Sequence, residues 1–247
     1  MTGTIKFLCG RCSAPDPKAV ETGGPSAEHA KIEETMARRT KQEAEQTREA
    51  ILDAAELVFS EHGVAHTSLD AVARQAGVTR GAVYHHFENK LDLFRALMQR
   101  IELPLFQRFE AATDDGVDDP VKAMRDSTLF AIEELIRDPH SRRTLDILFH
   151  RCEFVGELWP IIEGQHEKMH WFIERSAEAL ARAQANGLIR ADLDPRFGAT
   201  LYRTLVTGIV RDWLFSACRV DVRALSQRMI DHLLASFGYQ PCEGARP

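Results

Sequence analysis

The chain has 247 residues, of which 44% are hydrophobic and 28% are charged, and its formal net charge is −6 at pH 7. This composition is typical of a folded globular protein and excludes an intrinsically disordered chain, while the absence of an apolar run of about 18 residues excludes a membrane-spanning helix. The negative net charge excludes a nucleic-acid binder held mainly by a uniformly basic surface, so any DNA contact must come from a local face.

Residues 1–35 are predicted to be a disordered tail, or to precede a true translation start at Met36, because they contain turn and linker residues without a sustained period. Cys9 and Cys12 form a CxxC motif that could be half of a zinc site or a redox pair. No second pair lies at ligand spacing, so we expect neither a metal nor a cofactor. Five cysteines, an odd number, do not suggest a disulfide framework, and we expect a reducing, cytoplasmic location.

Residues 36–90 are predicted to form a DNA-binding domain. The cluster that contains Arg38 and Arg39 precedes the first predicted helix. It is either a solvated tail or a flexible arm that reaches phosphates or the minor groove. Thr47 is then expected to cap a helix that runs to about His62.

The next two helices carry the most informative pattern in the chain. Ser68 can cap the first, and Gly77 supplies the left-handed residue that ends it. Thr79 caps the second, from Arg80 to about Phe87. An ordinary helical hairpin would also have this spacing. The second helix, however, has an exposed face that is polar, aromatic and cationic at once, which favours a helix-turn-helix that presents this helix to the major groove.

Residues 91–240 are predicted to form a ligand-binding and dimerisation domain. Asn89 caps a long connecting helix, and Lys90 at its positive end is suited to grip a phosphate. Pro104 should kink this helix or end it, because proline lacks the backbone N–H.

Further helices are expected at about 120–137, 141–154, 158–186, 195–215 and 221–237, and with no strand-like alternation the predicted fold class is all-α. The last two helices are the most apolar. Their wide apolar faces suit a symmetric four-helix homodimer interface, and the alternative is an internal core of a monomer. We expect the dimer, because an operator with two-fold symmetry needs two copies of the DNA-binding domain, which we call the headpiece (residues 36–90).

No catalytic constellation is expected. His150 and Cys152 are close in sequence, but on a helix residues at i and i+2 point in different directions. No phosphate-binding loop, nucleophile elbow or paired metal motif accompanies them, so we predict that the protein is not an enzyme.

The helix-turn-helix resembles that of the TetR family of transcriptional regulators. The similarity lies in residues 47–59 and 67–90, which include GVTRGAVYHHF at 77–87. Similarity to the AcrR-type repressors of multidrug efflux operons continues through residues 141–154 and 208–215. His85 stands where these repressors commonly have tryptophan, which bears on operator preference.

The resemblance implies how DNA would be bound. Thr79, Arg80 and Gly81 would approach base edges and phosphates, while Tyr84, His86 and Lys90 would contact the DNA backbone. The chemistry agrees, since arginine pairs with guanine through two hydrogen bonds and hydroxyls suit phosphate oxygens. The full set of predicted DNA-binding residues is Arg38, Arg39, Thr67, Ser68, Thr79, Arg80, Gly81, Tyr84, His85, His86 and Lys90.

The resemblance also implies a ligand pocket inside the C-terminal bundle. Mostly apolar residues with a few polar groups occupy the matching positions, as a site for bulky hydrophobic drugs requires. They are Met124, Thr128, Leu145, Phe149, Phe172, Arg203, Val206, Thr207 and Val210.

The function that follows is a ligand-responsive dimeric repressor. It would bind double-stranded operator DNA beside an efflux-pump operon, without a membrane partner, and a hydrophobic small molecule would release it. The ligand would move the connecting helix, so that the two recognition helices lose the spacing of about one DNA turn (~34 Å). The alternative is a TetR-type regulator that senses a metabolite or fatty-acyl ligand and controls metabolic genes.

Overall fold

The computed structural model describes residues 27–153, 156–216, 219 and 221–240, with the side chains of residues 27–39 and of Glu157 left out of the description. The chain forms two compact units, Met1–Glu45 and Gln46–Pro247. Across the described residues there are nine α helices and two short helical turns but no strand, which confirms the all-α prediction.

Helix α1 (Ala27–His62) is longer than predicted. Its start at Ala27 shows that Thr47 lies inside the helix rather than at its cap, and that residues 27–35, expected to be disordered, have a helical backbone. The physical reason is composition, since Ala, Glu, Lys, Arg and Gln dominate this stretch and no Gly or Pro interrupts it. The rest of the predicted tail, residues 1–26, and the CxxC motif lie outside the described residues.

The helix-turn-helix comprises α2 (Leu69–Ala76) and α3 (Arg80–His86), and its ends are those that the sequence predicts. The Ser68 and Thr79 side chains accept hydrogen bonds from the Ala71 and Ala82 amides, respectively. Gly77 ends α2 in the left-handed region with φ of 68°, a conformation that costs glycine little and other residues more. The turn between the helices is therefore specified by three local residues.

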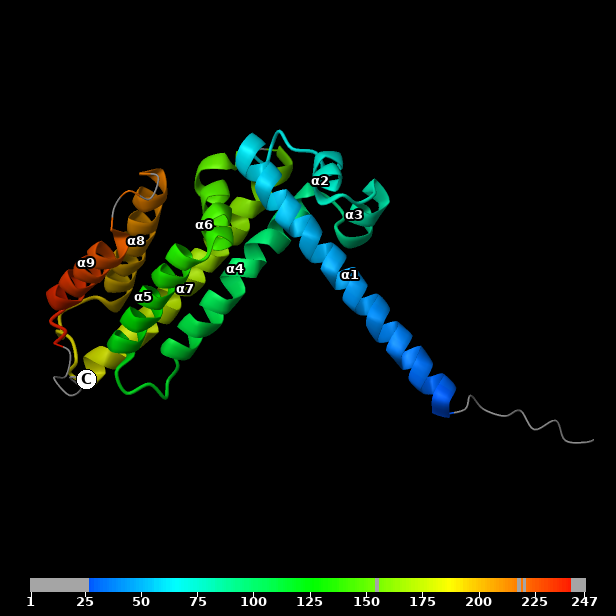
Figure 1. The fold of residues 1–247 in the computed structure, drawn as a ribbon. Coiled ribbons are helices and arrows are strands. Elements are labelled where there is room, and N and C mark those ends of the chain that lie inside the picture. Colours follow the sequence, from blue (N-terminus) through cyan, green and yellow to red (C-terminus); the bar gives the residue numbers. More distant parts are fainter. Residues whose placement is uncertain (1–26, 154–155, 217–218, 220, 241–247) are drawn as a thin grey trace, which may run out of the picture. The chain divides into compact units, whose positions relative to one another are not determined.

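Helix α4 (Lys90–Ala112) begins after the predicted Asn89 cap and continues through Pro104. The proline does not end the helix, although its missing N–H leaves the Arg100 carbonyl without its usual helical donor, and Leu103 and Pro104 are exposed. The connecting helix thus runs from the helix-turn-helix to the far end of the bundle (Figure 1).

The bundle consists of α5 (Pro120–Arg137), α6 (Pro139–Asp146), α7 (Trp159–Ala185), α8 (Pro195–Phe215) and α9 (Val222–Ser236). Helices α4, α5 and α7 lie side by side, and α8 packs against both α7 and α9 (Figure 1). The predicted helix at 141–154 is instead α6 followed by a π-helical turn at Ile147–Arg151. None of the described helices is long and apolar enough to cross a membrane.

Two hydrophobic cores are present, and they do not coincide with the two predicted domains. The first lies behind the helix-turn-helix and contains Phe59, Leu69, Val72, Val83 and Phe87. It also contains residues of α4 and, beyond α6, Ile147, Leu148, Leu158 and Ile161. The second core joins α5, α7, α8 and α9, and Leu145 and Phe149 pack against both. The helix-turn-helix is therefore packed in part against residues of the bundle.

Candidate DNA-binding surface and ligand-binding bundle

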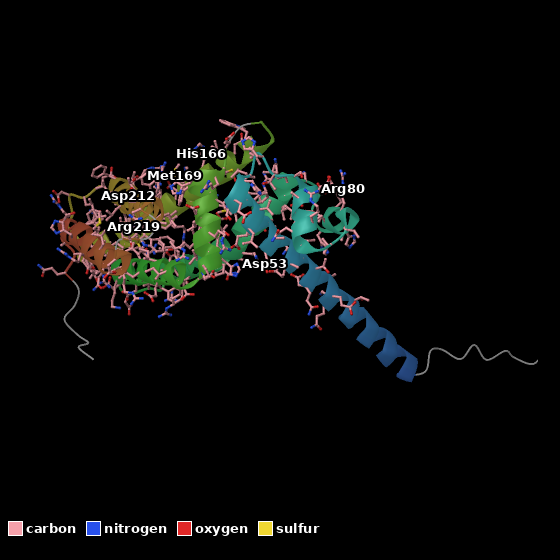
Figure 2. The ribbon with its side chains drawn as sticks, turned by 45° about the horizontal axis from the view of Figure 1, so that its top comes forward. Asp53, Arg80, His166, Met169, Asp212 and Arg219 are labelled. Carbon is pink, nitrogen blue, oxygen red and sulfur yellow. The ribbon has the colours of Figure 1, made fainter. Side chains whose placement is uncertain are left out.

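The exposed face of α3 and its cap brings together five of the eleven predicted DNA-binding residues. Thr79, Arg80, Gly81, Tyr84 and His85 are exposed, whereas Val83 of the same helix is fully buried. Arg80 lies at the outer surface of this helix (Figure 2). A short helix that buries one apolar residue and exposes this polar face has the form required to enter a groove.

Arg80 is held by a neighbouring helix and by its own. Its Nε lies 3.1 Å from Oδ1 of Asp70 in α2, and its Nη1 donates to Asp70 Oδ2 at 3.3 Å. Its Nη2 donates to the Tyr84 hydroxyl at 3.3 Å, and its guanidinium carbon lies 5.2 Å from the Tyr84 ring centre. The hydrogen bond with Tyr84 and the charge of Asp70 raise the pKa of Arg80 above its ordinary value. The side chain is therefore a fixed cation.

Three other predicted contact residues make local bonds within the headpiece. Thr67 is only 4% exposed and donates its hydroxyl to the Gly63 carbonyl at 2.8 Å, so its side chain faces inward rather than toward a ligand. The Ser68 hydroxyl caps α2. Lys90 is half-buried and its Nζ donates to the Ala65 carbonyl at 3.0 Å. These residues shape the surface around α3.

The remaining predicted contacts are His86 and the two arginines of the basic arm, Arg38 and Arg39. His86 is half-buried, and its ring lies edge-on to that of His85 with 5.2 Å between centroids. Arg38 and Arg39 lie in the α1 backbone, but their side chains are outside the described residues.

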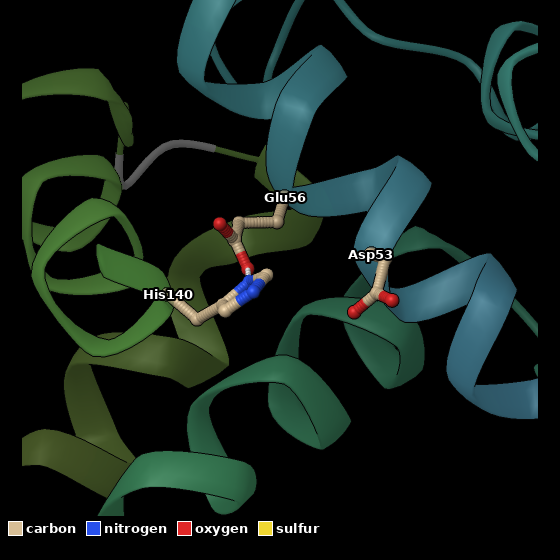
Figure 3. Close-up of side chains that lie close together, drawn as sticks. All are labelled: Asp53, Glu56 and His140. Carbon is tan, nitrogen blue, oxygen red and sulfur yellow. Dashed lines mark hydrogen bonds and ion pairs between the residues drawn. The ribbon is translucent and has the colours of Figure 1, made fainter. Parts of the chain in front are cut away.

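A charged cluster joins α1 to α6. Glu56 of α1 is fully buried, yet its carboxylate is paired with Arg143. The carboxylate also accepts a hydrogen bond from Nδ1 of His140 at 2.9 Å (Figure 3). Together with Asp53, Glu56 and His140 have the donor types of a metal site, with one ligand atom from each within 4.8 Å of the others. Arg143 and Arg100 already neutralise the two carboxylates, so we assign an ion-pair network.

Helix α4 forms ion pairs with α1 through Arg100 and with α7 through Glu102. Arg100 pairs with Glu49 at 2.6 Å and Asp53 at 2.8 Å, both in α1. Burial alone would lower the pKa of Arg100, but the hydrogen bonds and charges of these two carboxylates raise it. Glu102 pairs instead with Lys168 of α7.

The far end of α4 is attached to α7 as well. Arg175 and Arg182 donate to the Thr113 carbonyl at 3.0 Å and 2.7 Å. Helix α7 therefore contacts α4 both near its middle and at its C-terminal end.

The predicted ligand-binding residues lie in the bundle in different settings. Met124 and Thr128 are buried core, and the fully buried Tyr202 donates its hydroxyl to the Met124 carbonyl or to Thr128 Oγ1. Burial raises the pKa of Tyr202. Phe172 stacks on Phe109, with ring centroids 4.2 Å apart. The others, which are half-buried, are Leu145, Phe149, Arg203, Val206, Thr207 and Val210.

Two surface hollows lie along α8 and α9, away from most of the predicted ligand-binding residues. They have volumes of about 350 Å³ and 680 Å³ and share four lining residues, Thr204, Leu205, Leu225 and Met229. Leu201, Leu225 and Met229 are large apolar side chains that remain exposed there. The exposed apolar residues there lie beside polar and charged ones, among them Asp212, Arg228 and His232.

Three residues with structural roles at these sites are absent from the predicted set: Asp70, Glu56 and Arg143. Each forms its pair with a residue on another helix, and local periodicity carries no signal for such a pair. Asp70 also looks like an ordinary first-turn acid that favours the start of α2.

Comparison with known proteins identifies two family models along the chain. Residues 51–97 match the N-terminal region of bacterial regulatory proteins of the tetR family, and residues 119–239 match the C-terminal region of MAATS-type transcriptional repressors. The HTH-type transcriptional regulator AcrR of Shigella flexneri is 33% identical over 82% of this chain and 94% of its own length.

Two solved structures are similar over most of the chain. NalD, the secondary repressor of the MexAB-OprM multidrug efflux pump in Pseudomonas aeruginosa, is 36% identical over 80% of this chain and 96% of its own, with a TM-score of 0.68. A complex of SmeT of Stenotrophomonas maltophilia with triclosan is 32% identical over 82% of this chain and 98% of its own, with a TM-score of 0.72.

Proposed function

This chain belongs to the TetR family of transcriptional regulators, with a MAATS-type C-terminal region related to repressors of multidrug efflux pumps, and we propose that it represses an efflux-pump operon until a hydrophobic drug releases it. The family is one of DNA-binding regulators rather than of enzymes. The protein would act in the cytoplasm, where the operator is.

The observation that carries the DNA-binding part is the face of α3. Arg80, Tyr84 and His85 project from a helix whose opposite side is locked into the first core by Val83. An arginine there can form the two-bond pair with guanine that gives base specificity, and the neighbouring polar groups can bind phosphates. The net charge of −6 is then no obstacle, because the contacts are confined to one surface.

The inducer would enter the bundle among α5, α6, the π-helical turn, α7 and α8, where the predicted ligand-binding residues lie. SmeT, a relative with the same fold, is known as a complex with triclosan, which supports a hydrophobic inducer for this chain. A ligand that separates Phe172 from Phe109 would displace α7 against α4. Because Glu102 ties α4 to α7 while Arg100 ties α4 to α1, that displacement would reach the DNA-binding helices.

The dimer would form through α8 and α9, whose exposed Leu201, Leu225 and Met229 line the hollows described above. Two chains related by a two-fold axis place two copies of α3 on one face of the DNA. A ligand changes the spacing only if it binds the DNA-free conformation more tightly than the DNA-bound one.

The first experiment is a gel shift of the purified protein on the DNA that flanks its own gene, with and without triclosan and a panel of hydrophobic antimicrobials. Tyr84→Ala is the DNA-contact control. A specific shift that a drug releases is the expected result. A shift that no drug releases would retain the regulator and point to a metabolite or fatty-acyl inducer instead. A protein that shifts no flanking DNA would refute control of its own operon.

A further inference from the structure

We propose that Asp70 of α2 is a positioning residue for base recognition, so that the sequence preference at one operator position depends on Asp70 as well as on Arg80. The inference rests on the proposed function, because Asp70 matters for specificity only if Arg80 faces a base pair.

The first step is the geometry of the pair. Asp70 and Arg80 are ten residues apart and lie on different helices, with contacts of 3.1 Å and 3.3 Å between guanidinium nitrogens and carboxylate oxygens. Their approach depends on the turn at Gly77, which brings the start of α3 back to the start of α2. The same turn that defines the helix-turn-helix therefore also defines where the guanidinium group is held.

The second step is which N–H groups remain for DNA. Each terminal nitrogen of arginine has two N–H groups. One on Nη1 is used by Asp70 and one on Nη2 by Tyr84, which leaves one on each nitrogen. Two parallel N–H groups are what the O6 and N7 acceptors of guanine require. The side chain of Arg80 is 66% exposed, so DNA can approach it, and the two-bond contact with guanine requires that the two remaining N–H groups point the same way.

The third step is the energetic consequence. A free arginine loses rotamer freedom when it forms a two-bond contact, and a fork that is already fixed loses less. Asp70 has an opposite effect on DNA as a whole, because its negative charge repels phosphates. Removal of this charge should therefore lower the preference for guanine while raising affinity for unrelated DNA. A residue that served only α2 stability would do neither selectively.

The test is a selection from random-sequence duplexes, long enough to contain two half-sites about 34 Å apart. Bound and unbound pools are sequenced for the wild type, Asp70→Asn, Arg80→Ala and the double variant. Glu88→Gln is the matched control, because Glu88 is an exposed acid of the same headpiece for which no contact with Arg80 is described. Asp70→Glu tests whether the carboxylate can be partly replaced. Circular dichroism confirms that each variant is helical.

We expect Arg80→Ala to lower the preference for guanine at one symmetric pair of positions about tenfold or more. Asp70→Asn should lower it about threefold to tenfold at the same positions only, Asp70→Glu less, and Glu88→Gln not at all. In the Arg80→Ala background, Asp70→Asn should have no further effect there.

An unchanged preference in Asp70→Asn overturns the inference, and so does a uniform loss over the whole motif. An increased preference would show that Asp70 holds Arg80 away from DNA, which also overturns it. A wild-type protein that enriches no motif would instead refute the proposed function, so the two failures are distinguishable.

Discussion

Removal of Arg143 should destabilise this protein far more than removal of its partner Glu56. The Glu56 side chain is 1% exposed, whereas the side chains of Arg143 and His140 are 35% and 56% exposed. In Arg143→Ala the carboxylate stays buried with only the imidazole beside it. Breaking a buried pair costs about 3–5 kcal/mol, and because water can enter where Arg143 was, we expect about 3 kcal/mol. In Glu56→Gln the guanidinium of Arg143 and the imidazole of His140 remain partly exposed to water, and the cost should be about 1 kcal/mol.

The assay is urea unfolding followed by far-UV circular dichroism at one protein concentration, because a dimer's apparent stability depends on concentration. With a urea slope of about 2–3 kcal/mol per molar, a loss of 3 kcal/mol lowers the midpoint by about 1–1.5 M. Arg137→Ala is the matched control, since the Arg137 side chain is 68% exposed in its pair with Glu133. That pair should contribute about 0–1 kcal/mol.

The double variant Glu56→Gln, Arg143→Ala decides the reasoning. Once the buried charge is gone, loss of Arg143 should cost little more, so the double variant should be more stable than Arg143→Ala alone. Additive losses, or an Arg143→Ala cost no larger than that of Arg137→Ala, would refute the view that burial of Glu56 makes the pair asymmetric.

Three further predictions follow from single residues. Asp138 caps α6, and although burial would raise its pKa, hydrogen bonds from Ser141 and from the His140 amide lower it. Asp138→Ala should therefore lower the free energy of unfolding by about 1 kcal/mol at pH 7, and in urea titrations this difference should vanish as the pH falls through the lowered pKa. A difference that stays constant with pH would contradict the cap. Burial raises the pKa of Cys152 to about 11. In a variant with the other four cysteines replaced by serine, the reaction of Cys152 with a thiol reagent at pH 8 should be about 100-fold slower in the folded protein than after unfolding. Equal rates would show that the thiol is accessible. Leu225→Arg should convert the proposed dimer to a folded monomer in size-exclusion chromatography with light scattering, because Leu225 is 40% exposed in the single chain and would carry a charge into the proposed interface. A dimer that persists in this variant would place the interface elsewhere.

The local parts of this fold can be predicted from the sequence. The ends of α2 and α3 depend on Ser68, Gly77 and Thr79, each of which acts on backbone groups within a few residues. The same holds for Asn89 at the start of α4. Thr47 was misleading, because a threonine suited to a cap is also tolerated inside a helix when its neighbours are strong helix formers. The wrong prediction is thus a matter of context beyond the residue.

The candidate sites were predictable only in part, for a related reason. Exposure of Arg80 and Tyr84 follows from their helical spacing relative to the buried Val83. Thr67 has the same polar character, but a single hydrogen bond to Gly63 turns its side chain inward. The partners Asp70 and Glu56 depend on the crossing of helices that are distant in sequence. A periodic pattern predicts which side of its helix a residue lies on, but it does not predict which residue of another helix will contact it.

The first core has a consequence for how such regulators can be recombined. Ile147, Leu148, Leu158 and Ile161 complete the apolar cluster that holds the DNA-binding helices, and the Val64 amide donates to the Arg151 carbonyl at 3.0 Å. A headpiece cut out after α4 would leave that cluster open to water and that amide without its acceptor. We therefore expect that the headpiece does not fold stably without this segment. A chimera that joins it to a foreign bundle must also bring the segment from Ile147 to Ile161, or evolve a substitute for it.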